Sequence, residues 1–207
     1  MIYIEKGIEP HGLTQYRLST PNASYDGMPT NVKDDIKNHL LNEQCFICAY
    51  CMTQIQLNRT TIEHYVPQSV ERDKDLEYGN MLGVCRGNEG NPYTQQTCGS
   101  HRQNRTLTVN PLQMSSVEII SYSRSGQIKS TNAEIDYDLN ETLNLNVSFL
   151  VNNRKAVLAT MIEKLSVQKK TGSWKNMANK YIAKLNNPTK KTPYCGILLW
   201  YLNMKIR

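Results

Sequence analysis

The sequence predicts an α+β protein: a small core of short strands held together by cysteines, with a helix before it and a mainly helical region after it. A C-x2-C pair, Cys48 and Cys51, is followed by a short β-branched segment, Thr60–His64, and then by two more cysteines in a separate part of the chain. From about Val147 onward, apolar residues recur with the period of an α-helix. Hydrophobic residues make up 39% of the chain, with only two Phe and two Trp, so a modest core would gain from a cysteine staple.

The first segment, residues 1–44, is expected to be an arm followed by a helix. Residues 1–30 contain three prolines and little periodicity, which predicts irregular structure. Asn31 can cap a helix that runs to about Glu43. The apolar face of this helix would consist of Val32, Ile36, Leu40 and Leu41.

The second segment, residues 45–112, is expected to form the core. Gln54–Leu57 and Thr60–His64 are predicted to pair as a hairpin across the two residues between them. Residues 86–97 are polar and rich in Gly and Asn, which is typical of a loop.

The six cysteines are expected to bind metal rather than to form disulfides. The chain begins without an apolar signal segment and has no run long enough to span a bilayer, so we expect a cytoplasmic, reducing environment and no membrane partner. Cys45 forms a second C-x2-C pair with Cys48 and is a rival ligand, whereas Cys195 is expected to be an ordinary buried thiol. Unliganded core cysteines are the alternative. The predicted structural Zn²⁺ site consists of Cys48, Cys51, Cys85 and Cys98.

The third segment, residues 113–207, is expected to be mainly helical. Its last helix is apolar on every side between Ile197 and Leu202, so it must be buried in this chain's core or against a partner. The expected elements are a strand at Val117–Tyr122, a turn at Ser125–Gln127 and helices beginning near Val147, Trp174 and Thr192.

Positive charge is concentrated at the end of the chain. The net charge is +6, and Arg154 to Arg207 holds twelve of the 24 basic residues but one acidic residue, Glu163. Such a region attracts phosphate backbones or an acidic partner. A solvated helical face is the alternative interpretation.

An ordered set of polar residues accompanies the cysteines. After the C-x2-C pair come Glu63-His64-x-x-Pro67, then Asn80 with a cysteine five residues later, then Cys98 and a segment that contains a His and an Asn. This order resembles the HNH endonucleases. The resemblance implies a ββα-metal, treble-clef-like core and a metal-dependent enzyme that hydrolyses phosphodiester bonds.

The resemblance also implies roles for single residues. His64 matches the general base that activates water, Glu63 matches a ligand of the catalytic Mg²⁺ or Mn²⁺, and Asn80 matches the residue that steadies the loop. A His suits the first role because its ordinary pKa lies near neutrality.

The last metal ligand is left open between two residues. In the family pattern it follows the final cysteine directly, where this chain has Gly99. Asn104 and His101 are the candidates, with Asn104 preferred because some HNH enzymes use Asn there. His101 would otherwise contact phosphate or support the site.

Over nearly its whole length the chain is similar to the HNH subunits of Septu-type anti-phage systems (PtuB-like), which also accompany some retrons. The similarity includes Asn110-Pro111-Leu112 after a basic stretch, Arg154 in a Leu-bearing helix and a terminal helix rich in Tyr, Trp and Leu. It implies a defence nuclease controlled by a PtuA-like ATPase partner. The chain itself lacks a G-x-x-x-x-G-K-[ST] loop, so nucleotide control would come from that partner.

DNA is the expected substrate, and RNA such as tRNA remains an alternative. Two other functions compete with a defence nuclease. One is a zinc-stabilised nucleic-acid-binding module without catalysis, and the other is an HNH enzyme that acts without a partner.

Overall fold

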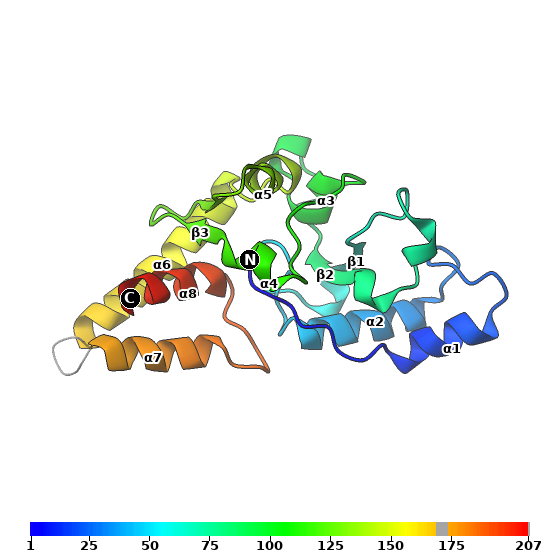
Figure 1. Cartoon of the computed structure of the whole chain (residues 1–207), viewed down its shortest axis with the longest axis horizontal. Helices are drawn as coiled ribbons and strands as arrows, with labels where there is room; N and C mark the ends of the chain where they lie inside the picture. The colour runs from blue at the N-terminus through cyan, green and yellow to red at the C-terminus, as the bar shows by residue number, and fades with distance from the viewer. Residues whose placement is uncertain (169–173, 207) are drawn as a thin grey trace.

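A computed structural model describes residues 1–168 and 174–206, and over these ranges the chain is an α+β protein with two small antiparallel sheets (Figure 1). The strands are β1 (Thr60–His64), β2 (Met81–Cys85), β3 (Ile120–Tyr122) and β4 (Ile128–Ser130). The helices are α1 (His11–Ser19), α2 (Thr30–Glu43), α3 (Cys98–Arg102), α4 (Met114–Glu118), α5 (Ala133–Tyr137), α6 (Ser148–Gln168), α7 (Trp174–Leu185) and α8 (Cys195–Ile206).

The central hairpin differs from the one that the sequence predicted. β1 pairs antiparallel with β2, so that Thr60 lies opposite Cys85 and His64 opposite Met81. Gln54 makes only an isolated bridge to Ile47, and a short 3-10 turn occupies Leu57–Arg59. The hairpin predicted between Gln54–Leu57 and Thr60–His64 was therefore wrong, because the chain after the first cysteine pair turns back on its own loop.

Helix α2 covers one side of this hairpin, and α1 packs on α2. The helix predicted near Asn31–Glu43 is confirmed as α2, which begins after Pro29 and packs on both strands. Residues 1–30 are less irregular than predicted, because α1 begins directly after Pro10 and packs on α2. A local apolar cluster joins these elements and includes Leu13, Ile36, Leu40 and Met81.

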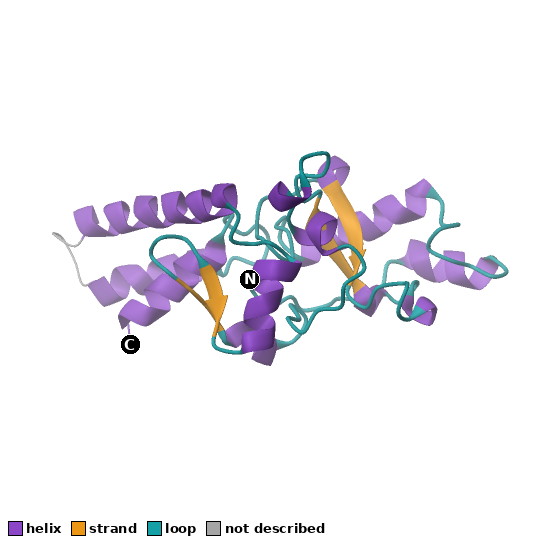
Figure 2. Ribbon diagram, turned by 90° about the horizontal axis from the view of Figure 1, so that it is seen from above, coloured by secondary structure: helices purple, strands orange, loops and turns teal. Residues whose placement is uncertain are grey.

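The predicted C-terminal helices are also present, as α6, α7 and α8. The apolar body of α8 is buried in this chain's own core, with Ile197 and Leu202 fully inaccessible. The strand predicted at Val117–Tyr122 is only half present, because its first residues end the helix α4 and only Ile120–Tyr122 pairs, with β4. Figure 2 shows the two sheets in separate parts of the molecule, each flanked by helices.

One large core connects the three segments into which the sequence was divided. Met1 and Ile4 from the first segment, Leu82 from the second and Leu202 from the third all belong to the same cluster of buried apolar residues. The basic residues Lys169, Lys170 and Arg207 lie outside the described ranges. Within those ranges, no helix combines the length and apolarity that a bilayer crossing requires.

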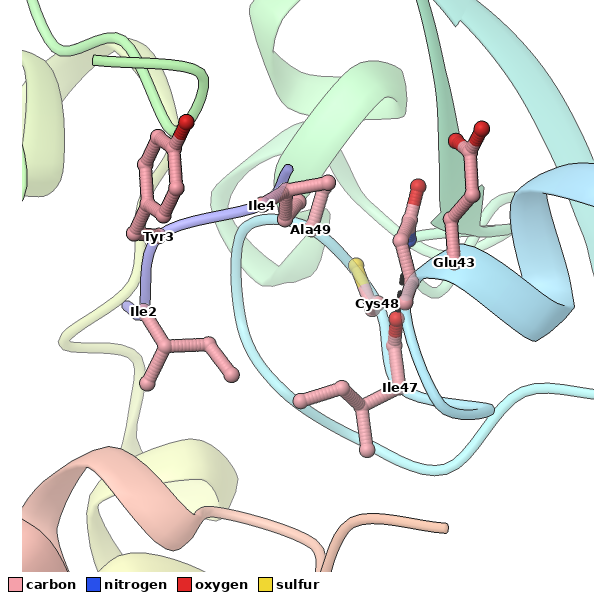
Figure 3. Close-up of a pocket in the computed structure, with 8 residues that line it drawn as sticks. Ile2, Tyr3, Ile4, Glu43, Ile47, Cys48 and Ala49 are labelled. Atoms are coloured by element: carbon pink, nitrogen blue, oxygen red, sulfur yellow. Dashed lines mark hydrogen bonds between the residues drawn. The ribbon is translucent and has the colours of Figure 1, made fainter. Parts of the chain in front are cut away.

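The N-terminal segment closes the loop that carries the first cysteine pair. Ile4 donates a backbone hydrogen bond of 2.9 Å to the carbonyl of Pro111. Figure 3 shows Ile2 and Ile4 on one side of a small pocket and Ile47 and Cys48 on the other. This cavity of about 20 Å³ holds little more than one water, so it is a packing gap and not a ligand site.

Candidate functional site

The four predicted cysteine ligands come together in space. Their sulfur atoms all lie within 4.8 Å of one another. The separation is 3.7 Å between Cys51 and Cys85, 3.7 Å between Cys85 and Cys98, and 3.9 Å between Cys48 and Cys98. A tetrahedral Zn²⁺ with bonds of about 2.3 Å places its sulfur ligands about 3.8 Å apart, so the cluster has the spacing of a zinc site.

Two residues, Gln44 and Gly87, allow the separate cysteine-bearing segments to lie close together. The Gln44 amide bridges them: its Nε2 donates to the carbonyls of Ile47 and Gly83, and its Oε1 accepts from Gly83 N–H. Gly87 turns the chain after Cys85 with φ +57°, and a Cβ there would lie 2.0 Å from the carbonyl oxygen of Thr97. Glycine is therefore required where the segment after Cys85 approaches the segment before Cys98.

The chemistry of the cluster also fits a cation. Crowding by the thiols of Cys48 and Cys51 raises the pKa of Cys85 well above that of a free thiol, so the four groups cannot all ionise without a compensating charge. Cys45 is outside the cluster, and its thiol instead lies 3.0 Å from the carbonyl of Pro188. Cys195 is a buried free thiol, as predicted.

His64 stands at the end of β1 with its ring held on two sides. Its Nε2 lies 2.9 Å from the carbonyl oxygen of Asp75, and its ring meets the Tyr25 ring edge-on at 4.6 Å between centroids. A carbonyl can only accept, so Nε2 carries the proton and Nδ1 is left with a lone pair. Burial lowers the pKa of His64, and the bond to the Asp75 carbonyl opposes this shift, so the ring is neutral near pH 7.

Glu63, the residue before His64 in β1, meets a buried arginine. Its Oε1 accepts a hydrogen bond of 2.7 Å from Nη1 of Arg102, whose side chain is 1% exposed. Burial raises the pKa of Glu63, while the guanidinium of Arg102 opposes the shift. Oε2 of Glu63 has no hydrogen-bond partner within the described ranges, so one carboxylate oxygen remains available to a metal ion.

Arg102 binds the backbone at the end of β1 in addition to the side chain of Glu63. Its guanidinium also donates to the carbonyls of His64 and Tyr65, at 3.0 and 2.6 Å, and to the hydroxyl of Tyr50. Because Tyr50 lies in the first cysteine loop, the arginine connects the cysteine cluster with the two residues that were expected to be catalytic.

Gly99 faces the same carboxylate. A Cβ at Gly99 would lie 2.6 Å from Oε2 of Glu63. The position directly after the last cysteine is thus close to Glu63, but here it offers no ligand atom and only leaves room for the carboxylate.

Asn80 is buried beneath the loop that follows β1. Its Oδ1 accepts from Val66 N–H at 2.8 Å, and its Nδ2 donates to the carbonyls of Val66 and Lys74 at 3.1 and 3.2 Å. Lys74 immediately precedes Asp75, whose carbonyl holds the His64 ring. Asn80 therefore fixes the loop that orients His64.

A polar pocket connects Glu63, His64 and Asn104. Gln68 lines it too, and its buried Nε2 has no hydrogen-bond partner within the described ranges. His101 does not line this pocket: it is buried, its Nδ1 lies 3.1 Å from the carbonyl of Thr142, and its ring stacks on Tyr93. The structure thus brings Asn104, and not His101, to the pocket with Glu63 and His64.

Sequence reasoning missed several residues that shape this site. Arg102 lies in a polar stretch after Cys98 and carries no signal that distinguishes it from a surface arginine. Tyr25 and Asp75 act through a ring edge and a backbone carbonyl, which no spacing rule reports. Only their nearness to the motif residues in space reveals them.

No family model matches the chain. Over 97 residues the chain is 29% identical to an Escherichia coli protein described as "Retron Ec83 putative HNH endonuclease". The match covers 41% of this chain and 37% of the length of that relative. It supports a distant relationship to HNH endonucleases.

Proposed function

We propose that the chain is a metal-dependent HNH endonuclease in which β1, β2 and α3 form the ββα-metal core and His64 is the general base. One observation carries the proposal. His64, Glu63 and Asn104 line a single pocket, and the His64 ring is held so that Nδ1 is the ring nitrogen able to take a proton. The cysteine cluster beside them supplies the structural Zn²⁺ site that stabilises the core.

The residues of the pocket fit a hard divalent cation. Oε2 of Glu63 and the amide oxygen of Asn104 are the ligand type that Mg²⁺ and Mn²⁺ prefer. Such a cation, when bound, relieves charge on the phosphate and on the leaving oxygen. Arg102 keeps the carboxylate of Glu63 in one orientation, and His64 takes the proton of the attacking water at Nδ1.

The biological setting that we propose is anti-phage defence with DNA as the substrate. The name of the E. coli relative places that protein with a retron, and the sequence resembles the HNH subunits of Septu-type systems. We propose the same biological setting for this chain: the nuclease would be the effector of a defence complex controlled by a PtuA-like ATPase. The basic C-terminal region, residues 113–207, would be the docking surface.

A cleavage assay with one substitution tests the catalytic proposal. Wild-type protein and His64→Ala are incubated with plasmid DNA and with total RNA in Mg²⁺ or Mn²⁺, and zinc content and circular dichroism verify the fold of both. We expect DNA cleavage by the wild type and a loss of about 10²–10⁴-fold in His64→Ala. Equal cleavage by the two proteins would show that His64 is not the general base. Cleavage of RNA alone would show that the chain is a ribonuclease.

The partner proposal has its own test. The chain is tagged and purified from its native operon, with and without ATP. Recovery of an ATPase subunit in a stable complex is the expected result. A fully active monomer that retains no partner would instead favour an enzyme that acts alone.

A further inference from the structure

We infer that the substrate strand reaches His64 across the face formed by α2 and β1, and that Lys33, Lys37 and Arg86 bind its phosphates there. This inference rests on the proposed nuclease function and specifies where that enzyme holds nucleic acid. It assigns the phosphate-binding surface to the side of the hairpin that α2 covers, and not to the basic C-terminal region.

The first argument is the continuity of the surface. A groove lined by Lys33, Lys37 and Arg86 adjoins the pocket that contains His64, and both hollows share Tyr25 and Ile62 as lining residues. The groove has a volume of about 440 Å³, so it can hold part of an extended polymer strand. A strand in the groove would therefore lead directly to the ring of His64.

The second argument is a set of contacts that joins the two hollows. Nζ of Lys33 lies 4.7 Å from the centre of the Tyr25 ring, and the same ring meets the His64 ring edge-on. Tyr25 therefore lies at the junction of the two hollows. A cation lies over one part of its ring, and the imidazole of His64 lies against another part. Tyr25 can offer its ring to a sugar or base while the neighbouring cation meets a phosphate.

The third argument is charge. Three cationic side chains line the groove, and Asp34 is the single carboxylate among its lining residues. Asp34 is 3.0 Å from Lys37, while Lys33 has no carboxylate within ion-pair distance in residues 1–168 and 174–206. Arg86 is exposed and only loosely paired with Glu89, at 3.3 Å. The excess of positive charge suits a polyanion.

The C-terminal lysines are poorly placed for the same task. Figure 1 shows α2 beside β1 and β2, with α7 and α8 at the opposite end of the molecule. Lys155 of α6, Lys180 of α7 and Lys205 of α8 are exposed, but none of them lines either hollow. They provide a matched control, because their removal changes the net charge equally.

Binding measurements on two triple variants test the inference. In a His64→Ala background, Lys33→Gln/Lys37→Gln/Arg86→Gln is compared with Lys155→Gln/Lys180→Gln/Lys205→Gln. Fluorescence anisotropy with labelled single-stranded and double-stranded DNA, without added divalent cation, gives Kd over a series of NaCl concentrations. We expect the groove variant to bind at least about 10-fold more weakly and to lower the slope of log K against log salt by about 2–3, since each phosphate contact contributes about 0.7–0.9.

The outcomes separate this inference from the nuclease proposal. A loss of binding that is confined to the C-terminal variant, or that is equal in both variants, would contradict phosphate binding in the groove. Binding through the groove by a wild-type protein that cleaves nothing would overturn the nuclease and leave the groove standing. Zinc content and circular dichroism verify the fold, and if the groove triple variant fails to fold, the exposed single variant Arg86→Gln must still lower the salt slope by about 0.7–0.9.

Discussion

Arg102 and Glu63 form a buried ion pair in which the guanidinium nitrogen Nη1 lies 2.7 Å from Oε1 of the carboxylate. The pair connects the last turn of α3 to the end of β1, one residue before His64. It leaves Oε2 of Glu63 without a protein hydrogen bond in the part of the chain that the structure describes. A residue that looked like an ordinary surface arginine in the sequence therefore determines how the expected metal ligand is presented.

Replacing Arg102 with Met should destabilise the protein by about 3–5 kcal/mol, because the carboxylate of Glu63 would then be buried without its partner. Urea unfolding followed by circular dichroism measures the change. The double variant Glu63→Gln/Arg102→Met removes both charges and should recover part of the loss. If the double variant is less stable than Arg102→Met by the full cost of Glu63→Gln alone, the two side chains are not coupled.

Removing one cysteine of the cluster should abolish metal binding and most of the folding energy of the core. Structural Zn²⁺ contributes on the order of 10 kcal/mol in small zinc modules. We expect Cys48→Ser to contain no zinc and to lose its cooperative thermal transition. Cys45→Ser is the matched control, because Cys45 lies in the same loop but outside the cluster. Elemental analysis should find one Zn per chain in wild type and in Cys45→Ser, and a zinc-free wild type would refute the site.

Asn80→Ala should weaken both the fold and the orientation of His64. The substitution leaves the N–H and carbonyl of Val66 without their Asn80 partner and removes one of the two hydrogen bonds to the Lys74 carbonyl, which costs about 1–3 kcal/mol. Chemical denaturation measures this loss, and the cleavage rate should fall with it. Asn176→Ala on the exposed side of α7 makes the same chemical change and should stay within about 0.5 kcal/mol of wild type. Equal stability of the two variants would contradict the role of Asn80.

The sequence predicted the parts of this site that depend on residue type and spacing. The predicted zinc site requires the thiols of Cys48 and Cys98 to meet, which is possible only if the chain between them folds back. The prediction of the metal site was therefore also a prediction of a tertiary contact. The apolar periodicity of α7 and the uniformly apolar body of α8 were equally direct signals, because burial of these residues decides their structure.

The errors have a common physical cause. Gln54–Leu57 was expected to pair with β1, but the cysteine loop folds back so that Gln54 pairs with Ile47. The partner of β1 is therefore Met81–Cys85. Val117 likewise has a strand propensity that the end of α4 overrides. Arg102 escaped notice since its role depends on carbonyls and a carboxylate that only the folded chain brings together.

The cleavage rate should depend on pH through His64. Burial lowers the pKa of His64 below its ordinary value of 6.5, and the active general base is the neutral ring. We therefore expect a rate that is constant above pH 6.5 and falls as the pH drops through the lowered pKa, measured at saturating Mn²⁺. The residual activity of His64→Ala should lack this step. A half-maximal rate above pH 6.5 would show that the ring is not held as the structure describes.

Asn104 and His101 should respond to substitution in opposite ways, because one lines the pocket and the other is packed away from it. Asn104 is exposed, so Asn104→Ala should keep the stability of wild type but require about 10-fold more Mn²⁺ for half-maximal cleavage, which corresponds to about 1.4 kcal/mol of metal affinity. His101 is bonded to the carbonyl of Thr142 and stacked on Tyr93, so His101→Ala should cost about 1–3 kcal/mol in unfolding free energy and leave the Mn²⁺ dependence unchanged. Titration of cleavage with Mn²⁺, together with urea unfolding of both variants, separates the two roles. The reverse pattern would make His101 the metal ligand, and would require α3 to rearrange before the metal binds.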